Sequence, residues 1–250
     1  MTRVIKIGGR AQGDEGLFAQ IAQSAISDRI CIVHGGGDEV TALMRRLGRE
    51  PTFVNGRRVT TNEDISVVRM VLSGLANKRL VSALTSTGVR AVGISGEDDG
   101  LISATLLDGG ALGCVGEPAQ VTSTLLLHLM DGGYVPVVSP VGRGPAGEAL
   151  NINGDDAAAS IAAALGADEL LFVADVPGVF DASGATIPEL YAGDVDRLMA
   201  GGVAKGGMHA KLEACLRALR GGVSGVRIGD VLAIGDPDRG TSVRLSPSAV

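Results

Sequence analysis

The sequence has few of the residues that mark several common classes of protein. Its 250 residues include 3 cysteines, no tryptophan and only 2% aromatic residues. Cys31, Cys114 and Cys215 are far apart and odd in number, so they fit neither a disulfide framework nor a zinc pair. No apolar run approaches the roughly 18 residues that a membrane span requires, and no positively charged leader precedes Val4 to Gly9. We therefore expect a cytoplasmic protein with reduced thiols and no membrane partner.

An excess of basic charge is also lacking. The formal net charge is -6 and the sequence pI is about 5.1. Binding along a nucleic-acid backbone needs clustered, excess lysine and arginine. We therefore expect no nucleic-acid partner, although local basic sites remain possible.

Short apolar runs that end in glycine or a polar residue alternate with helix-like stretches, which predicts an α/β three-layer αβα sandwich with a mainly parallel central sheet. Residues 102–120, which are broken by glycines, indicate antiparallel hairpins instead. The glycines and the proline in residues 142–148 suggest a boundary between lobes 1–141 and 142–250. The predicted strands are 3–7, 30–33, 91–94, 135–138 and 169–173, and the predicted helices are 17–27, 39–47, 63–87, 155–165 and 208–219.

Two predicted strands end in glycines. Lys6 precedes Gly8 and Gly9, and His34 precedes Gly35, Gly36 and Gly37. Glycine lets the backbone approach a ligand, and amides at a helix start can hold an anion. Ligands of open α/β sheets gather beyond the carboxyl ends of the strands. These residues therefore indicate a phosphate site, while plain turns and a structural His34 remain the simpler interpretation of each segment alone.

The common nucleotide-binding motifs are missing. The sequence has no Walker loop, no Gly-x-Gly-x-x-Gly pattern with an acidic partner, and neither His-Arg-Asp nor Asp-Phe-Gly. A P-loop kinase, a dehydrogenase and a protein kinase are thus disfavoured. A phosphate site in this chain must be of another kind.

Three later segments carry polar residues beside predicted helices or strands. Residues 151–156 read Asn-Ile-Asn-Gly-Asp-Asp, which is either a helix cap or part of a site. Residues 173–180 run into a Pro-Gly turn, where a nucleotide base can lie. Residues 205–211 place Lys205 before a helix and Lys211 in its first turns. On local grounds, a simple turn explains residues 173–180 equally well, and a solvent-facing lysine is the simpler interpretation of Lys211.

Together and in this order, the segments resemble the amino acid kinase family, and within it the acetylglutamate kinases. The resemblance spans most of the chain. The strings that carry it are Phe-Val-Asn-Gly-Arg-Arg-Val-Thr (53–60), Ala-Asn-Lys (76–78), Asn-Ile-Asn-Gly-Asp (151–155), and Gly-Gly-Met (206–208) followed by Lys211.

This resemblance implies an ATP- and Mg²⁺-dependent kinase that phosphorylates the side-chain carboxylate of N-acetyl-L-glutamate. It implies that lobe 1–141 binds the acyl-amino acid and forms the dimer, and that lobe 142–250 binds ATP. No protein side chain is implied as a metal ligand. The implied residues are Lys6, Asp155 and Lys211 for catalysis, Gly36, Gly37, Arg58 and Asn151 for the acceptor, and Gly8, Gly9, Asp175, Val176, Pro177, Gly178, Val179, Phe180, Val203, Ala204 and Lys205 for the nucleotide.

Two features depart from the family pattern. Nine residues separate Asp230 from Gly240, where the family usually has a longer helical stretch. The chain also begins at its first predicted strand, without the leading helix of arginine-inhibited hexamers, so we expect an arginine-insensitive homodimer. The alternatives are an aminoadipate-type kinase, acting on a carrier-bound or N-acetylated substrate, and a non-catalytic sensor.

Overall fold

The computed structural model describes residues 1–54, 56–200 and 206–245. In this part of the chain, eight strands form a central sheet in the order β12-β14-β13-β11-β1-β2-β8-β5. The six strands β13, β11, β1, β2, β8 and β5 are parallel to one another. At the edge, β14 runs antiparallel to β13, and β12 runs parallel to β14. The strands are β1 (Thr2–Ile7), β2 (Arg29–His34), β5 (Ala91–Ser95), β8 (Val135–Ser139), β11 (Glu169–Val173), β12 (Glu189–Tyr191), β13 (Gly225–Gly229) and β14 (Thr241–Arg244).

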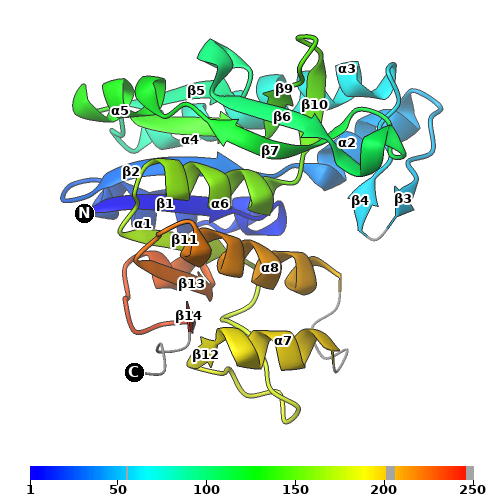
Figure 1. Ribbon diagram of the computed structural model, residues 1–250. Coiled ribbons are helices and arrows are strands. Elements are labelled where there is room, and N and C mark those ends of the chain that lie inside the picture. The colour runs from blue at the N-terminus through cyan, green and yellow to red at the C-terminus, as the bar shows by residue number, and fades with distance from the viewer. Residues whose placement is uncertain (55, 201–205, 246–250) are drawn as a thin grey trace.

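Helices cover both faces of this sheet (Figure 1). Helices α5 (Thr124–Asp131), α6 (Gly154–Ala164) and α8 (Gly207–Arg220) pack on one face. Helices α1 (Leu17–Ser24) and α4 (Asn77–Ser86) pack on the other. Helix α7 (Ala192–Ala200) lies beside α8. The predicted three-layer sandwich is therefore confirmed.

The alternation of side chains along β1 positions the first candidate residue. Successive side chains of a strand point to opposite faces. Val4 belongs to the core beneath α6 and α8, whereas Ile5 and Ile7 belong to the core beneath α1 and α4. Lys6 therefore points toward α6 and α8, near the carboxyl end of its strand.

A smaller sheet lies beyond the β5 side of the central sheet (Figure 1). Its strands are β6 (Ile102–Leu106), β7 (Val115–Val121), β9 (Val141–Arg143) and β10 (Ala149–Ile152), whose pairings close into a ring. β6 and β7 are antiparallel, as predicted for residues 102–120. The glycine-rich residues 144–148 join β9 to β10 as the turn of a hairpin. The division into lobes at residue 141 remains a prediction.

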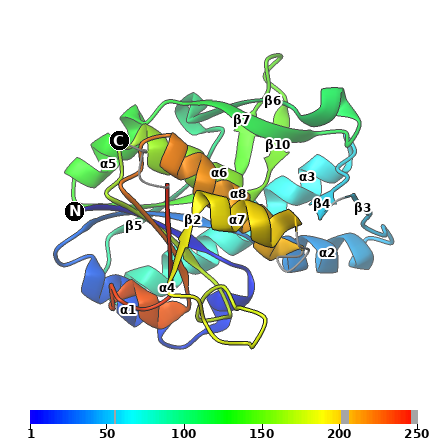
Figure 2. The same cartoon turned by 60° about the horizontal axis from the view of Figure 1, so that its bottom comes forward.

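Residues 64–86, within the predicted helix 63–87, form one continuous helical stretch with an irregularity that the sequence did not predict. Helix α3 (Asp64–Arg69) runs into a π-helical segment, Met70–Ala76, which continues as α4. A short hairpin of β3 (Phe53–Val54) and β4 (Arg57–Arg58) lies beside helix α2 (Gly37–Arg46), as Figures 1 and 2 show. This hairpin and α3 flank the same end of the molecule.

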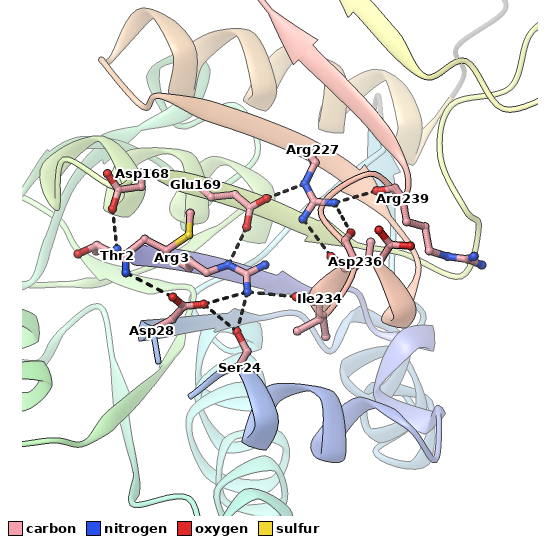
Figure 3. Close-up of polar contacts among 12 residues, drawn as sticks. Thr2, Arg3, Ser24, Asp28, Asp168, Glu169, Arg227, Ile234, Asp236 and Arg239 are labelled. Atoms are coloured by element: carbon pink, nitrogen blue, oxygen red, sulfur yellow. Dashed lines mark hydrogen bonds and ion pairs between the residues drawn. The ribbon is translucent and has the colours of Figure 1, made fainter. Parts of the chain in front are cut away.

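The amino-terminal ends of β1 and β11 hold a buried ion network (Figure 3). Glu169 accepts hydrogen bonds from Nε of Arg3 at 2.7 Å and from Nε of Arg227 at 2.6 Å. Arg227 also donates to the carbonyl oxygens of Ala233, Asp236 and Arg239. The network therefore fixes the short connection between β13 and β14, which contains a 3-10 helix at Val231–Ile234 and no longer helix.

Candidate active site

The glycine turns after β1 and β2 lie side by side at the carboxyl edge of the sheet. The backbone N–H of Gly35 donates to the carbonyl oxygen of Ile7 at 3.1 Å, and that of Gly8 donates to Val173 at 3.0 Å. The turns after β1, β2 and β11 are thus held together. Both glycine turns that were predicted to form a phosphate site therefore lie at one edge of the sheet.

The glycines in these turns serve different purposes. A Cβ atom on Gly36 would lie 2.8 Å from Cδ2 of Leu72, so Gly36 permits the close approach of the α3–α4 helical stretch. A Cβ atom on Gly9 would meet nothing within 4 Å. The backbone at Gly9 therefore borders open space, which leaves room for a ligand.

Helix α6 presents its first turn at the same edge. The side chain of Asn153 caps the helix, accepting hydrogen bonds from the backbone N–H groups of Asp155 and Asp156 at 2.8 and 3.3 Å. Asparagine is among the preferred N-cap residues. The cap interpretation of residues 151–156 is therefore correct for Asn153, and the cap fixes the backbone that carries Asp155.

Asp155 brings two lysines together although they lie far apart in the sequence. Its Oδ1 atom lies 2.7 Å from Nζ of Lys6, and its Oδ2 atom lies 3.1 Å from Nζ of Lys211. The exposed fractions of Lys6, Asp155 and Lys211 are only 8%, 7% and 9%. The structure thus assembles all three predicted catalytic residues in one buried cluster.

The electrostatics of this cluster favour a charged carboxylate. Burial alone would raise the pKa of Asp155, but the positive charges of Lys6 and Lys211 outweigh it and lower that pKa below its usual range. Burial lowers the pKa of Lys211, as does the charge of Lys6, while Asp155 opposes both. Two ammonium groups against one carboxylate leave excess positive charge, which suits an anionic ligand.

A cavity opens beside this cluster, and we call it the lysine cavity. Asp175 and Val176, two of the residues predicted to bind the nucleotide, line it, and so does Arg10, which was not predicted. Arg10 pairs with Asp175 at 3.2 Å. The lining also includes Lys6, Gly8, Gly9, Gly37, Asp155 and Lys211.

Four other predicted nucleotide residues lie apart from the lining of the lysine cavity. Gly178 is packed so closely that an added Cβ would lie 2.6 Å from Oγ1 of Thr241, and the N–H of Val179 donates to that oxygen. Pro177 is half-buried, and the side chain of Phe180 is exposed. Val203, Ala204 and Lys205 lie outside the described residues.

A second cavity, the arginine cavity, is lined by Arg57, Arg58, Asn151 and the glycines of the second turn. Arg58 is buried, and its Nη2 donates to the carbonyl oxygen of Gly37 at 2.8 Å and to Oγ1 of Thr41 at 2.7 Å. The side chain of Asn151 donates to Oγ1 of Thr60 at 3.0 Å. Both predicted acceptor-binding side chains thus border one cavity, which is apolar where Val68 and Leu72 line it.

Gly37 lines both cavities, and the neighbours Gly154 and Asp155 line one each. The two cavities therefore adjoin at the first turns of α2 and α6. Helix N-termini favour negative charge because unpaired N–H groups point outward there. The junction is suited to a group that passes from a ligand in one cavity to a ligand in the other.

His34 plays no part in these cavities. It is fully buried, its Nδ1 atom lies 2.9 Å from the carbonyl oxygen of Gly35, and its Nε2 atom lies 3.2 Å from Nδ2 of Asn77. Burial lowers the pKa of His34 to about 4. The interpretation of His34 as a structural residue is therefore consistent with its surroundings.

The sheet is mainly parallel, and its carboxyl edge carries two buried lysines and two adjoining cavities. These features are typical of an enzyme that binds and transfers phosphate groups. The chain belongs to the amino acid kinase family, whose model matches residues 1–230. It is a phosphotransferase of that family.

The chain is also similar to individual members of this family and to solved structures. The chain is 48% identical to an acetylglutamate kinase from Dinoroseobacter shibae over 225 residues, which cover 88% of this chain and 78% of the relative. A solved structure from Streptococcus mutans UA159 matches with a TM-score of 0.88 at 30% identity, covering 97% of this chain and 98% of that one. A carbamate kinase from Giardia lamblia shares the fold, with a TM-score of 0.72 at 16% identity and 98% of each chain covered.

Proposed function

We propose that this enzyme transfers the γ-phosphoryl group of ATP to the side-chain carboxylate of N-acetyl-L-glutamate, giving N-acetylglutamyl 5-phosphate and ADP in arginine synthesis. The observation that carries the proposal is the contact of Asp155 with both Lys6 and Lys211 at the junction of the two cavities. Relatives named acetylglutamate kinase support the choice of substrate.

The reaction needs no nucleophile from the protein. A carboxylate oxygen of the substrate bonds to the γ-phosphorus while the bond from that phosphorus to the β,γ-bridging oxygen breaks, and ADP leaves with the electron pair. Phosphoryl transfer depends mainly on positioning and on stabilisation of the charge on the transferring oxygens. Lys6 and Lys211 supply that positive charge, and Asp155 holds both ammonium groups in place.

The arginine cavity provides the acceptor site. An arginine can grip a carboxylate through two parallel hydrogen bonds. Arg58 would hold the α-carboxylate, and the Asn151 amide would hold a second polar group of the acyl-amino acid. Gly36 and Gly37 would offer backbone N–H groups to the reacting end.

The lysine cavity suits the nucleotide phosphates, since Gly9 leaves open space beside the lysines and Gly8 keeps the turn close to β11. Asp175 and Val176 would border the rest of ATP. Among the described residues, no group of three or more His, Cys, Asp or Glu side chains could hold a metal ion. Mg²⁺ would thus be held largely through the phosphates, and it would neutralise their charge.

Three further proposals follow from the family. Lobe 1–141 would bind the acceptor and form a homodimer, and lobe 142–250 would bind ATP. The enzyme would act in the cytoplasm. In the described part of the chain, no helix has both the length and the apolar character to cross a membrane.

The test is ADP release from MgATP with N-acetylglutamate, N-acetylaminoadipate and glutamate supplied in parallel, with hydroxylamine to trap the acyl phosphate. A strong signal with N-acetylglutamate alone, absent from Lys6→Ala, is the expected result. Silence with all three acceptors would reject the proposal and favour a carrier-bound aminoadipate substrate or a sensor.

A further inference from the structure

Arg57 and Arg58 are consecutive residues of β4, yet they attach the hairpin to two different helices. Nη2 of Arg58 donates to the carbonyl oxygen of Gly37, the first residue of α2. Nη2 of Arg57 donates to Oδ2 of Asp156, in the first turn of α6, at 3.0 Å. Both arginines line the arginine cavity. The hairpin is therefore tied to both helix N-termini at the cavity junction.

The contact between Arg57 and Asp156 is well shielded from water. The side chain of Asp156 is only 5% exposed, and that of Arg57 is 23% exposed. Within the described residues, Nη1 of Arg57 is buried and has no hydrogen-bond partner. A buried donor without an acceptor is unfavourable. The guanidinium nevertheless keeps the orientation in which Nη2 reaches Asp156, so this contact outweighs the missing partner of Nη1.

Asp156 also faces the helix that carries Lys211. Nη2 of Arg217, on α8, lies 3.7 Å from Oδ1 of Asp156. The hairpin, α6 and α8 thus meet at this one carboxylate. Movement of Arg57 relative to Asp156 would change the position of the hairpin relative to the lysines.

The two partners are each next in sequence to a residue of the proposed reaction. Arg58, the proposed anchor of the α-carboxylate, follows Arg57, and Asp155, which holds both lysines, precedes Asp156. We propose that the Arg57–Asp156 ion pair sets the distance between the carboxylate anchor and the phosphoryl group, and that it thereby selects the length of the dicarboxylate acceptor. This inference rests on the proposed function.

The size of the effect follows from the geometry of the transfer. One methylene more or less moves the reacting carboxylate by about 1 Å, and a misplacement of about 1 Å can lower the rate about 100-fold. An acceptor of the wrong length is therefore discriminated mainly in kcat, provided that the anchor cannot shift. Loosening the ion pair lets the anchor adjust, so selectivity falls.

The experiment compares kcat/KM for N-acetylglutamate, the shorter N-acetylaspartate and the longer N-acetylaminoadipate. In Arg57→Met, which keeps much of the side-chain length but removes the charge, the preference for N-acetylglutamate over either analogue should fall at least tenfold. KM for ATP should change less than twofold. Arg57→Lys, which retains a positive charge, should recover part of the selectivity.

The matched control is Arg69→Met, which breaks an ion pair with Glu97 outside both cavities and should leave the selectivity unchanged. If Arg57→Met fails to fold, Asp156→Asn weakens the same contact, keeps the side-chain shape, and should give the same loss of selectivity. A merely structural role for Arg57 would lower the rates with all three acceptors equally.

The outcomes separate this inference from the proposed function. Wild-type activity on N-acetylglutamate, with an unchanged preference in both Arg57→Met and Asp156→Asn, overturns the role of the ion pair and leaves the proposed function intact. If the wild-type enzyme is inactive with N-acetylglutamate, both the proposed function and the role of the ion pair are overturned.

Discussion

The Oδ1 atom of Asn153 accepts a hydrogen bond from the backbone N–H of Asp155 at 2.8 Å, so the helix cap and the lysine-binding carboxylate are two residues apart. Because the cap fixes the first turn of α6, it also fixes the direction in which the Asp155 side chain points. Asn151, two residues before Asn153, also borders the arginine cavity, but its side chain donates to Oγ1 of Thr60 rather than capping the helix. The two asparagines of one motif therefore have different physical tasks.

Replacement of Asn153 by alanine should lower both stability and activity. Loss of an N-cap hydrogen bond typically costs about 1 kcal/mol, and the freed first turn should no longer hold Asp155 rigidly. Urea denaturation and kcat measure the two effects. Asn153→Ser, which restores a capping oxygen, should recover most of both; a serine variant as impaired as the alanine variant would argue against capping.

Asp155→Asn should lower kcat by about 100- to 1,000-fold, the range found when one preorganised electrostatic contact is removed from an active site. The amide cannot balance the charges of Lys6 and Lys211, so the two ammonium groups should move apart. Steady-state kinetics with saturating MgATP measures the loss. Asp131→Asn, which alters an exposed pair with Arg29, should keep normal activity, and an active Asp155→Asn enzyme would contradict the role of the cluster.

Arg58→Lys should raise KM for N-acetylglutamate about 10- to 100-fold, because a lysine cannot form the two parallel hydrogen bonds of a guanidinium. KM for ATP should stay near its wild-type value, since Arg58 lines the arginine cavity and is not among the described residues that line the lysine cavity. Initial rates at varied concentrations of each substrate measure the two KM values separately. Arg45→Lys, on the exposed surface of α2, is the matched control, and equal increases in both KM values would indicate general misfolding.

His34 should make the protein less stable in acid. Its pKa is 6.5 in the unfolded reference and about 4 in the folded protein because burial disfavours the charged ring. Between these values the unfolded chain binds more protons, so the free energy of unfolding should fall by about 3 kcal/mol as the pH drops from 6.5 through 4. Above pH 6.5 this group should contribute no pH dependence.

Urea denaturation at a series of pH values measures that slope. In His34→Gln the part of the slope between pH 6.5 and 4 should be reduced, whereas His209→Gln, at a half-buried position on α8, should leave it as in the wild type. Identical slopes in wild type and His34→Gln would rule out His34 as the cause.

Glu169→Gln should destabilise the fold by about 3–5 kcal/mol, because it removes a negative charge shared by two buried arginines, Arg3 and Arg227. Since the network lies at the amino-terminal ends of β1 and β11, kcat below the unfolding temperature should be nearly unchanged. Thermal unfolding and a low-temperature assay test both points. A loss of activity larger than the loss of folded protein would connect this network to catalysis.

Much of the sheet could be predicted from sequence because buried parallel strands appear as short apolar runs. Residues 169–173 match β11 at both ends, and residues 3–7 miss only the first residue of β1. Helix α7 was not predicted, and neither was the short strand β12 before it. Many of their residues, 189–200, are charged or small, but Val195, Leu198 and Met199 have the spacing of one helix face and pack on the core. That short apolar pattern was overlooked.

The site was predicted less completely. Lys6, Asp155 and Lys211 were identified through the family resemblance, since locally Lys211 was no more than a lysine on a helix. The contact between Arg57 and Asp156 joins residues 99 positions apart, and no pattern of one sequence reveals such a pair. Arg10 beside Gly9 was overlooked because an exposed arginine in a turn is ordinary. Long-range electrostatic partners therefore required the folded chain.

The π-helical segment Met70–Ala76 changes the phase of the helix that contains it. Val71 and Leu72 pack near the arginine cavity with residues of α2, whereas Leu80 and Leu84 of α4 pack under the central sheet. If the same residues were wound as a regular α-helix throughout, α4 would be rotated by about 100° relative to α3. Asn77 would then lose its 2.8 Å hydrogen bond to the carbonyl oxygen of Val137. The π-helical segment thus allows one continuous helix to pack its apolar side chains into two separate hydrophobic cores.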